Sequence, residues 1–403
     1  MNQSYDVIIV GGGASGMIAA VKAAERGLNV FLTEKNQMLG RKVFATGNGR
    51  CNILNRHLHQ YYGDSCFADS VFKYCNTDTL ISFFKYYGLM LTEEDDGRMY
   101  PNTFHSSSVV SAMKKALAIH NVDISLQTRI VQIKKEKSIF TVISSEGYQV
   151  TSPKVIISCG GSAQPKLGGT TDGYDLLKSL GHSIVPVFPS LVPVVTDQKS
   201  VSGLSGIRVH CTVTVLDSSQ IIYRTSGEVL FTEYGISGIC IMQCSRFVHQ
   251  RNAIIEIDFI HNLFSDNSLF KAELKRRQAV FKDYSPVSLL EGIIIDRLSY
   301  AVLKQAGIPL RGEKASDLSN EDLDRIIDKA CHYRIHVIAD RGIDFAQVSA
   351  GGASCSQFSP STMESNIVPG LYATGEVLNV DGDCGGYNLM FAFATGFIAG
   401  ESC

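Results

Sequence analysis

Three glycines near the start of the chain have the spacing of a phosphate-binding turn. Gly11, Gly13 and Gly16 form a G-x-G-x-x-G pattern directly after the apolar run Val7–Val10. In such a turn the first glycine permits a tight bend, the second lets the backbone approach a pyrophosphate, and the third allows close helix packing. The Ala-rich stretch Met17–Arg26 predicts a helix, whose free N–H groups and positive dipole end would face the phosphates. These residues predict a dinucleotide site on a Rossmann-type unit.

A carboxylate stands where such a unit would hold the ribose of an adenosine. Glu34 follows Leu28–Leu32, the predicted second strand of a strand–helix–strand unit. Its side chain can accept hydrogen bonds from both ribose hydroxyls, and its charge would repel a 2′-phosphate, so NADP is disfavoured at this site. FAD and NAD both contain ADP, so this first segment does not distinguish between them.

The last part of the chain supplies a second set of candidates. Val368–Glu376 predicts a short strand ending in an acidic residue, and Tyr387–Gly396 opens an apolar helix after a glycine-rich loop. Glu376 could bind the hydroxyls of a ribityl chain. The N–H groups of Asn388 and Leu389 could face the flavin edge where negative charge develops on reduction. This segment favours FAD over NAD, with an ordinary strand, loop and helix as the alternative.

At this point the chain resembles a known family. Gly40–Lys42 and Thr46–Asn52 are similar to the "GRK…TGxGRCN" signature of a group of bacterial flavoproteins, and Gly385–Leu389 matches its "GGYNL" motif. The group includes aminoacetone oxidase and a flavin-dependent bile-acid enone reductase. Further matches are Gly160–Gly161, Gly173–Tyr174, Leu180–His182, Leu230–Thr232, Gly235–Gly238 and Thr362–Ser365. The resemblance spans essentially the whole chain and implies a FAD domain made of two segments around a long insertion.

The pattern in the middle of the chain independently favours such an insertion. Strands are predicted over Ile207–Val215, Ile221–Tyr223, Val229–Thr232, Ile254–Phe259 and Tyr333–Ala339. Residues 266–331 have a helical pattern, in which Ser319 is a predicted N-cap with Asp322 at N3. We therefore expect an α/β protein with a Rossmann-type FAD-binding domain over 1–190 and 344–403. A β-rich, barrel-like insertion over 191–343 would carry a helical subdomain over about 264–331.

The resemblance also assigns the loop after the second strand to the cofactor. Arg41, Lys42 and Arg50 would bring positive charge to the pyrophosphate and flavin, and the backbone amides of Thr46–Asn52 would surround them. Taken without the resemblance, these residues are ordinary surface charges on a loop.

One apolar contact is expected beneath the adenine. Ile130 is the first candidate and Val131 the second, with simple core packing as the alternative for either residue. The predicted cofactor contacts are Gly11, Gly13, Ala14, Ser15, Gly16, Glu34, Lys35, Arg41, Lys42, Thr46, Gly47, Gly49, Arg50, Cys51, Asn52, Ile130, Gly375, Glu376, Asn388 and Leu389.

The sequence does not identify a catalytic residue. Hydride transfer depends mainly on positioning, although a proton donor is often required beside it. Candidates for that donor are Tyr100, His105, Glu233, Tyr234 and Tyr387. His105 precedes a predicted helix start, where capping or surface exposure is favoured. Glu233 stands where many members of the group carry histidine. The substrate of any one member therefore cannot be assigned directly to this chain.

Composition and charge exclude several classes of protein. Of the 403 residues 45% are apolar, and the formal charge is −2, which predicts neither disorder nor a nucleic-acid surface. We expect no signal peptide and no membrane-spanning segment. The eleven scattered cysteines fit reduced thiols in a cytoplasm. Cys240 and Cys244 share one face of a predicted helix, where ordinary burial is favoured over a metal site. No metal is predicted, and the expected partner is a small molecule.

Three hypotheses about function follow. The first is an FAD-dependent oxidoreductase that reduces a conjugated C=C bond of a hydrophobic, steroid-like ketone. Its electrons would come from NAD(P)H bound transiently, since the chain has no second G-x-G-x-x-G pattern. The second is an aminoacetone-type amine oxidase that uses O2. The third is a non-catalytic flavin redox sensor, supported only by Cys51 beside the cofactor loop.

Overall fold

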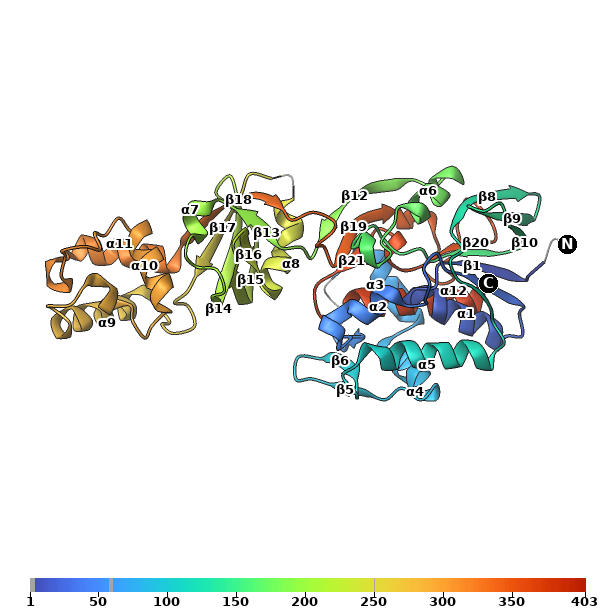
Figure 1. The fold of residues 1–403 in the computed structure, drawn as a ribbon, viewed down its shortest axis with the longest axis horizontal. Coiled ribbons are helices and arrows are strands. Elements are labelled where there is room, and N and C mark those ends of the chain that lie inside the picture. The colour runs from blue at the N-terminus through green and yellow to red at the C-terminus, as the bar shows by residue number, and fades with distance from the viewer. Residues whose placement is uncertain (1–3, 58–60, 250) are drawn as a thin grey trace. The chain divides into compact units, whose positions relative to one another are not determined.

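The computed structural model describes residues 4–57, 61–249 and 251–403. The chain forms two compact units (Figure 1). The first contains Met1–Pro189 and Ala346–Cys403, and the second contains Ser190–Phe345. Among the described residues, no helix combines the length and apolar character needed to cross a membrane.

A parallel sheet forms the centre of the first unit. Its strands lie in the order β20, β11, β1, β2, β7, and every neighbouring pair is parallel. The bounds are β1 (Val7–Val10), β2 (Val30–Thr33), β7 (Asp123–Ser125), β11 (Val155–Ile157) and β20 (Leu371–Ala373). The segments β1, β2, β11 and β20 are buried along their whole length, as expected of strands covered on both faces. This confirms the Rossmann-type fold.

The first helix begins earlier than predicted. Helix α1 (Ala14–Glu25) starts directly after Gly13, three residues before the Ala-rich stretch that indicated it. The first turn contains Gly16, which lowers helix propensity and conceals the start of the helix in the sequence. Strand β2 likewise lies one to two residues later than its apolar pattern suggested.

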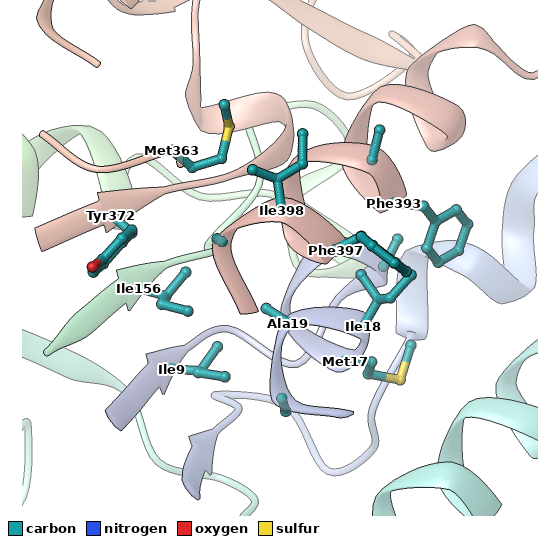
Figure 2. Close-up of a cluster of buried hydrophobic side chains, with 14 of the residues drawn as sticks. Ile9, Met17, Ile18, Ala19, Ile156, Met363, Tyr372, Phe393, Phe397 and Ile398 are labelled. Carbon is teal, nitrogen blue, oxygen red and sulfur yellow. The ribbon is translucent and has the colours of Figure 1, made fainter. Parts of the chain in front are cut away.

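Helix α12 (Tyr387–Ser402), at the end of the chain, lies against α1. Figure 2 shows Phe393, Phe397 and Ile398 from α12 beside Ile18 and its neighbours on α1. Two glycines allow this approach. A Cβ on Gly396 would lie 2.3 Å from the carbonyl oxygen of Ser15, and one on Gly400 would lie 2.4 Å from that of Ala19. The first and last segments therefore share one core.

The remaining elements of the first unit surround this core. Small sheets are formed by β8 (Ile130–Glu136), β9 (Ile139–Ser144) and β10 (Gln149–Ser152); by β3 (Leu54–Asn55), β6 (Arg98–Pro101) and β5 (Leu91–Glu93); by β12 (Ile184–Ser190) and β19 (Val348–Ala353); and by β21 (Val380–Gly382) and β4 (Tyr61–Gly63). The helices are α2 (Arg41–Ala45), α3 (Ser65–Tyr74), α4 (Thr77–Tyr86), α5 (Ser106–Ile119) and α6 (Asp172–Ser179).

The second unit is a closed barrel with helices. The barrel strands follow the order β13 (Val194–Thr196), β16 (Gly235–Ser237), β15 (Gln220–Phe231), β14 (Arg208–Asp217), β17 (Ala253–Asp258) and β18 (Tyr333–Asp340). The helices are α7 (Gln198–Val201), α8 (Ile239–Val248), α9 (Asn267–Val280), α10 (Asp296–Gln305) and α11 (Asn320–Cys331). A barrel-like insertion that carries helices is confirmed. Cys240 and Cys244 are both buried on α8.

One prediction about the barrel was wrong. Ile221–Tyr223 and Val229–Thr232 were expected as separate strands, but both belong to the continuous strand β15. The residues between them pair with β14, where Ser226 lies opposite Thr212 and Gly227 opposite Cys211. A Cβ on Gly227 would lie 3.3 Å from the side chain of Cys240 on α8, so glycine permits this contact and hides the strand.

The predicted cap of α11 is confirmed. Ser319 Oγ accepts a hydrogen bond from the N–H of Asp322 at 3.1 Å, and the Ser319 N–H donates to the Asp322 carboxylate at 2.7 Å. This reciprocal pair is a capping box. The predicted apolar face of the helix is buried and consists of Leu323, Ile326, Ile327 and Ala330.

Candidate cofactor site

The carboxyl ends of four parallel strands meet at one edge of the sheet. Gly11 follows β1, Glu34 follows β2, Ser158–Gly161 follow β11, and Thr374–Glu376 follow β20. A cavity of about 1190 Å³, including the open space at its mouth, lies there. Its wall contains these predicted contacts: Gly11, Gly13, Ala14, Ser15, Glu34, Lys35, Arg41, Lys42, Thr46, Ile130, Glu376, Asn388 and Leu389.

The three glycines of the first turn have different surroundings. Gly11 has φ +110°, and a Cβ there would lie 2.4 Å from the carbonyl oxygen of Ser158. A Cβ on Gly16 would lie 1.8 Å from the carbonyl oxygen of Gly11. Beyond its chain neighbours, no atom of the described residues lies within 4 Å of the Cβ position of Gly13, which lines the cavity. Gly11 and Gly16 therefore shape the turn, whereas Gly13 leaves space for a ligand.

The N-terminus of α1 has the properties of an anion site. Its N-cap, Gly13, has no side chain to accept a hydrogen bond from the first N–H groups of the helix. Ala14 and Ser15 line the cavity, as do the basic side chains of Arg41 and Lys42. Unsatisfied N–H groups, a helix dipole and two cations suit a pyrophosphate.

Glu34 is held in place by the backbone around it. Its Oε2 accepts a hydrogen bond from the N–H of Gly12 at 2.9 Å, and its Oε1 accepts two from Asn36, at 2.8 Å from the backbone and 2.6 Å from the side chain. Glu34 as a whole residue is 8% exposed. Since a carboxylate has about four acceptor sites, this arrangement keeps the charge at the edge of the sheet with acceptor capacity remaining.

Glu376 is part of an ion pair that links the two segments. Lys42 Nζ lies 2.9 Å from Glu376 Oε2, while the backbone N–H and the hydroxyl of Ser349 both donate to Oε1 at 2.8 Å. Burial alone would raise the pKa of Glu376, but the charge of Lys42 and these hydrogen bonds outweigh it and hold the pKa below its ordinary value. Glu376 is therefore an ionised carboxylate inside the cavity wall.

The start of α12 provides a second set of free N–H groups. Its N-cap is Gly386, with φ +94° and no capping side chain. The side chain of Asn388 accepts from the N–H of Gly382 and donates to its carbonyl oxygen, both at 2.8 Å, which fixes the preceding loop. The backbones of Asn388 and Leu389 are therefore positioned at the cavity wall.

The two candidates for an adenine contact differ in burial. Ile130, the first residue of β8, is 4% exposed and lines the cavity, whereas Val131 is 48% exposed on the other face of the strand. Lys35 also lines the cavity, and burial lowers the pKa of its ammonium group. Of the two candidates, only Ile130 is placed to touch a ligand there.

The remaining predicted contacts lie outside the cavity wall. They are Gly16, Gly47, Gly49, Arg50, Cys51, Asn52 and Gly375. The guanidinium of Arg50 lies 4.9 Å from the ring centre of Tyr100 and 4.7 Å from that of Phe104, and it pairs with Glu94 at 3.2 Å. Cys51 is fully buried, which raises the pKa of its thiol to about 11. A neutral, buried thiol is poorly suited to redox sensing.

The five proton-donor candidates also lie outside the cavity wall. Tyr100 and Tyr387 are buried, and burial raises the pKa of both hydroxyls. His105 is exposed at the N-cap of α5, where its side chain makes no capping hydrogen bond. Glu233 and Tyr234 belong to the second unit, and Glu233 is exposed.

Several wall residues were missed by the sequence reasoning. Gln347 and Val348 line the cavity from the start of β19, next to the Ser349 that holds Glu376. Asp172, at the start of α6, lines it and receives two hydrogen bonds from Arg129, at 3.0 and 2.6 Å. No local pattern marks these residues, because they reach the site through strand and helix pairing over long sequence distances.

The fold and the site define a two-segment flavoprotein of the class of FAD-dependent oxidoreductases. The chain belongs to the HI0933-like family, because the family model described as "HI0933-like protein Rossmann domain" matches residues 5–402. It is 34% identical, over 98% of both chains, to the 3-dehydro-bile acid delta(4,6)-reductase of Clostridium scindens.

Two other comparisons are informative. The ribosomal RNA dihydrouridine synthase of Haemophilus influenzae is 28% identical over 98% of both chains. Among solved structures, the 3-ketosteroid delta1-dehydrogenase of Sterolibacterium denitrificans has a TM-score of 0.52 and 13% identity, with 99% of each chain covered. The structural likeness shows a shared fold. The sequence predicted no nucleic-acid partner for this chain. Because this relative is a ribosomal RNA enzyme by name, the absence of such a partner stays a prediction.

Proposed function

We propose that this protein reduces a carbon–carbon double bond conjugated to a ketone in a hydrophobic, steroid-like molecule, with bound FAD and with NAD(P)H as electron donor. The observation that carries the proposal is the full-length similarity to a bile-acid reductase. In the overall reaction, a hydride from NAD(P)H and a proton add across the double bond, and NAD(P)+ is released.

The chemistry named for two relatives points in the same direction. A 3-dehydro-bile acid with double bonds at positions 4 and 6 has them conjugated to its 3-ketone. The double bond that is lost when uridine becomes dihydrouridine is also conjugated to a carbonyl. Both reactions reduce an electron-poor C=C bond, so the relatives share a reaction class. The identity of the substrate that carries this bond has to be tested by experiment.

The first half of the cavity suits the ADP part of FAD. We assign the pyrophosphate to the N-terminus of α1 beside Gly13, with Arg41 and Lys42 as its cations. Glu34 would bind the ribose hydroxyls, and Ile130 would cover the adenine. Each assignment uses a group that already lines the cavity and has a compatible charge or polarity.

The second half of the cavity suits the flavin. Glu376 retains acceptor capacity for ribityl hydroxyls beside the hydrogen bonds from Lys42 and Ser349. The N–H groups of Asn388 and Leu389 would stabilise negative charge at the ring edge. Bound FAD would supply the hydride-transfer chemistry, while the protein holds the ring and excludes water. Gly47, Gly49, Arg50, Cys51 and Asn52 would shape the loop around it.

The test begins with the purified protein under anaerobic conditions. We expect heat to release FAD, and NADH or NADPH to bleach the flavin absorption before mixing with a conjugated 3-ketosteroid restores it. A flavin that stays oxidised with both nucleotides, and a full panel of enones left unreduced, would refute the proposal. Peroxide release with small amines in air would instead support the amine-oxidase alternative.

A uridine in ribosomal RNA is the second candidate substrate, because two dihydrouridine synthases match 98–99% of this chain. The charge distribution argues against it. Residues 190–345 contain 18 Lys and Arg against 19 Asp and Glu, whereas RNA binding depends on an excess of cations that neutralise phosphates. We expect no dihydrouridine when the reduced protein is incubated with unmodified ribosomal RNA, measured by mass spectrometry of nucleosides.

A further inference from the structure

A compact loop of the first unit connects β11 to α6. This loop, residues 161–170, is closed at its base, where the N–H of Thr170 donates to the carbonyl oxygen of Gly161 at 2.9 Å. Within it, the N–H of Gly169 donates to the carbonyl oxygen of Gln164 at 3.1 Å. Compact surface loops whose ends lie close together are frequently functional.

The 161–170 loop forms one wall of the cavity, to which Leu167, Gly168 and Thr170 contribute. A second wall is formed by residues 34–36, at the end of β2, and residues 128–130, at the start of β8. A backbone hydrogen bond of 2.9 Å, from residue 128 to residue 34, joins the two segments of this second wall. The second wall contains the residues assigned above to the adenosine of FAD.

An ion pair joins the two walls. Arg129 donates from Nε to Oδ2 of Asp172 at 3.0 Å and from Nη2 to Oδ1 at 2.6 Å, and both residues line the cavity. Burial alone would raise the pKa of Asp172, but the hydrogen bonds from Arg129 and Thr170 outweigh it and hold the pKa below its ordinary value. Two parallel bonds to an ionised carboxylate fix the relative position of the groups that carry them.

A second contact joins the loop to the same wall. Gly168 has φ +107°, and a Cβ on it would lie 2.7 Å from Nδ2 of Asn36. Asn36 is itself held, because its side chain donates to Glu34 at 2.6 Å and accepts from Arg41 at 3.1 Å. The contact at Asn36 is one of shape, whereas the Arg129–Asp172 pair is a charged, bidentate interaction.

We propose that the Arg129–Asp172 pair is a clasp that holds the 161–170 loop over the ADP half of the cavity, and that opening of this clasp admits and releases FAD. The inference rests on the part of the proposed function that assigns FAD to this cavity. Both partners of the clasp are protein side chains, so the clasp forms with and without FAD. Its loss raises the open fraction in both states and accelerates association and dissociation alike.

The test measures both rate constants by flavin fluorescence. FAD-free protein is mixed with FAD in a stopped-flow instrument, and the holoprotein is diluted into an excess of another apoflavoprotein that captures released FAD. We expect Arg129→Met to raise both rate constants about 5-fold and to leave the Kd within about twofold, because a bidentate pair lies at the upper end for exposed pairs. Arg129→Lys keeps the charge and loses the parallel bonds, so intermediate rates are expected.

The matched control is Arg334→Met, in the barrel. Arg334 pairs with Glu256 at 3.0 Å, and their side chains are 55% and 13% exposed, close to the 58% and 11% of Arg129 and Asp172. This variant loses an equivalent ion pair outside the cavity wall and should change neither rate constant.

Two further variants separate a clasp from a direct contact with FAD. Asp172→Asn and the double variant Arg129→Met/Asp172→Asn remove the same pair, so the double variant should exchange FAD no faster than the faster single variant. Additive effects on the rates overturn the inference. So does an Arg129→Met protein whose rates equal those of the wild type, or one in which dissociation alone is faster. Should Arg129→Met fail to fold, Arg129→Lys carries the same comparison.

The measurement needs no substrate and no NAD(P)H, so its outcome is distinct from that of the proposed reaction. A protein that exchanges FAD as expected but reduces no enone retains the clasp and refutes the enone reductase. Unchanged exchange rates in a protein that does reduce an enone refute the clasp alone. A protein that takes up no FAD overturns both.

Discussion

Replacing Gly396 by alanine adds one methyl group at the closest approach of α12 to α1. The new Cβ would lie 2.3 Å from the carbonyl oxygen of Ser15 and 2.6 Å from the Cγ2 of Ile18. Ordinary contacts begin at about 3.4 Å, so the two helices must separate by ~1 Å. The backbone oxygen belongs to the first turn of α1 and has no rotamer that would relieve the clash.

Two effects of opposite sign determine the size of the change. Alanine gains ~1 kcal/mol of helix propensity over glycine in a helix interior. Overpacking in a core costs ~1–3 kcal/mol and reaches the upper end when the clash is with backbone. Separation of the helices also loosens contacts of buried side chains such as Phe393 and Phe397. We expect a net loss of ~2 kcal/mol, which for a unit of this size lowers Tm by roughly 4–8 °C.

The assay is thermal unfolding of the FAD-free protein followed by circular dichroism, for the wild type and Gly396→Ala. Gly13→Ala is the matched control, because beyond its chain neighbours the same methyl group there meets no atom of the described residues within 4 Å. Only the poorer N-cap preference of alanine, worth less than ~1 kcal/mol, should lower its Tm. A Tm for Gly396→Ala within about 1 °C of the wild-type value would refute the reasoning, since it would mean that the helices yield without cost.

The remaining predictions concern the cofactor. Gly13→Ala should lower the Tm of the FAD-free protein much less than Gly396→Ala does. It should raise the Kd for FAD at least ~10-fold, measured by equilibrium dialysis, because its Cβ enters the space assigned to the pyrophosphate. Glu34→Gln should also weaken FAD at least ~10-fold, because a charged acceptor for the ribose is lost; unchanged affinity would remove the assignment. Lys42→Met should cost ~2 kcal/mol near pH 7, since burial raises the pKa of Glu376 and only the hydrogen bonds from Ser349 would then oppose it. The lowered pKa of the wild type gives stability that is fully present above the unfolded pKa of ~4.3 and is lost only below it. A raised pKa in the variant is instead a penalty that is present at pH 7 and is relieved as the pH falls towards ~4.3. The Tm deficit of the variant should therefore narrow on acidification, and a constant deficit from pH 7 to 4 would contradict the ion pair.

The features that sequence predicts well here are those decided over short distances. Gly11, Gly13 and Gly16 lie within one turn, so their spacing alone encodes the geometry of the bend. The capping box of Ser319 and Asp322 is likewise complete within four residues. Local hydrogen bonds and sterics are strong enough in both places that the rest of the chain does not alter them.

The features that sequence does not reveal depend on distant partners. Lys42 and Glu376 are 334 residues apart, and neither residue shows locally that it pairs with the other. Ser349 donates two hydrogen bonds to Glu376 only because strand β19 packs beside the segment that follows β20. The continuity of strand β15 also depends on a distant partner. Gly227 interrupts the strand pattern in the sequence, and the close contact that requires glycine there is made by Cys240 of α8. Tertiary context decides each of these cases.

The order of the central strands makes the cofactor site depend on closure of the whole first unit. Strand β1 lies between β2 and β11, and β20 joins beyond β11 after an insertion of more than 150 residues. Glu376 and the start of α12 reach the cavity only when the last segment has packed against α1 through Gly396 and Gly400. A ligand that contacts both segments binds the closed form alone, so by linkage it stabilises that form against opening. Any fall in the closed fraction of Gly396→Ala raises the apparent Kd for FAD by the same factor, so the α1–α12 contact acts on cofactor retention without touching the cofactor.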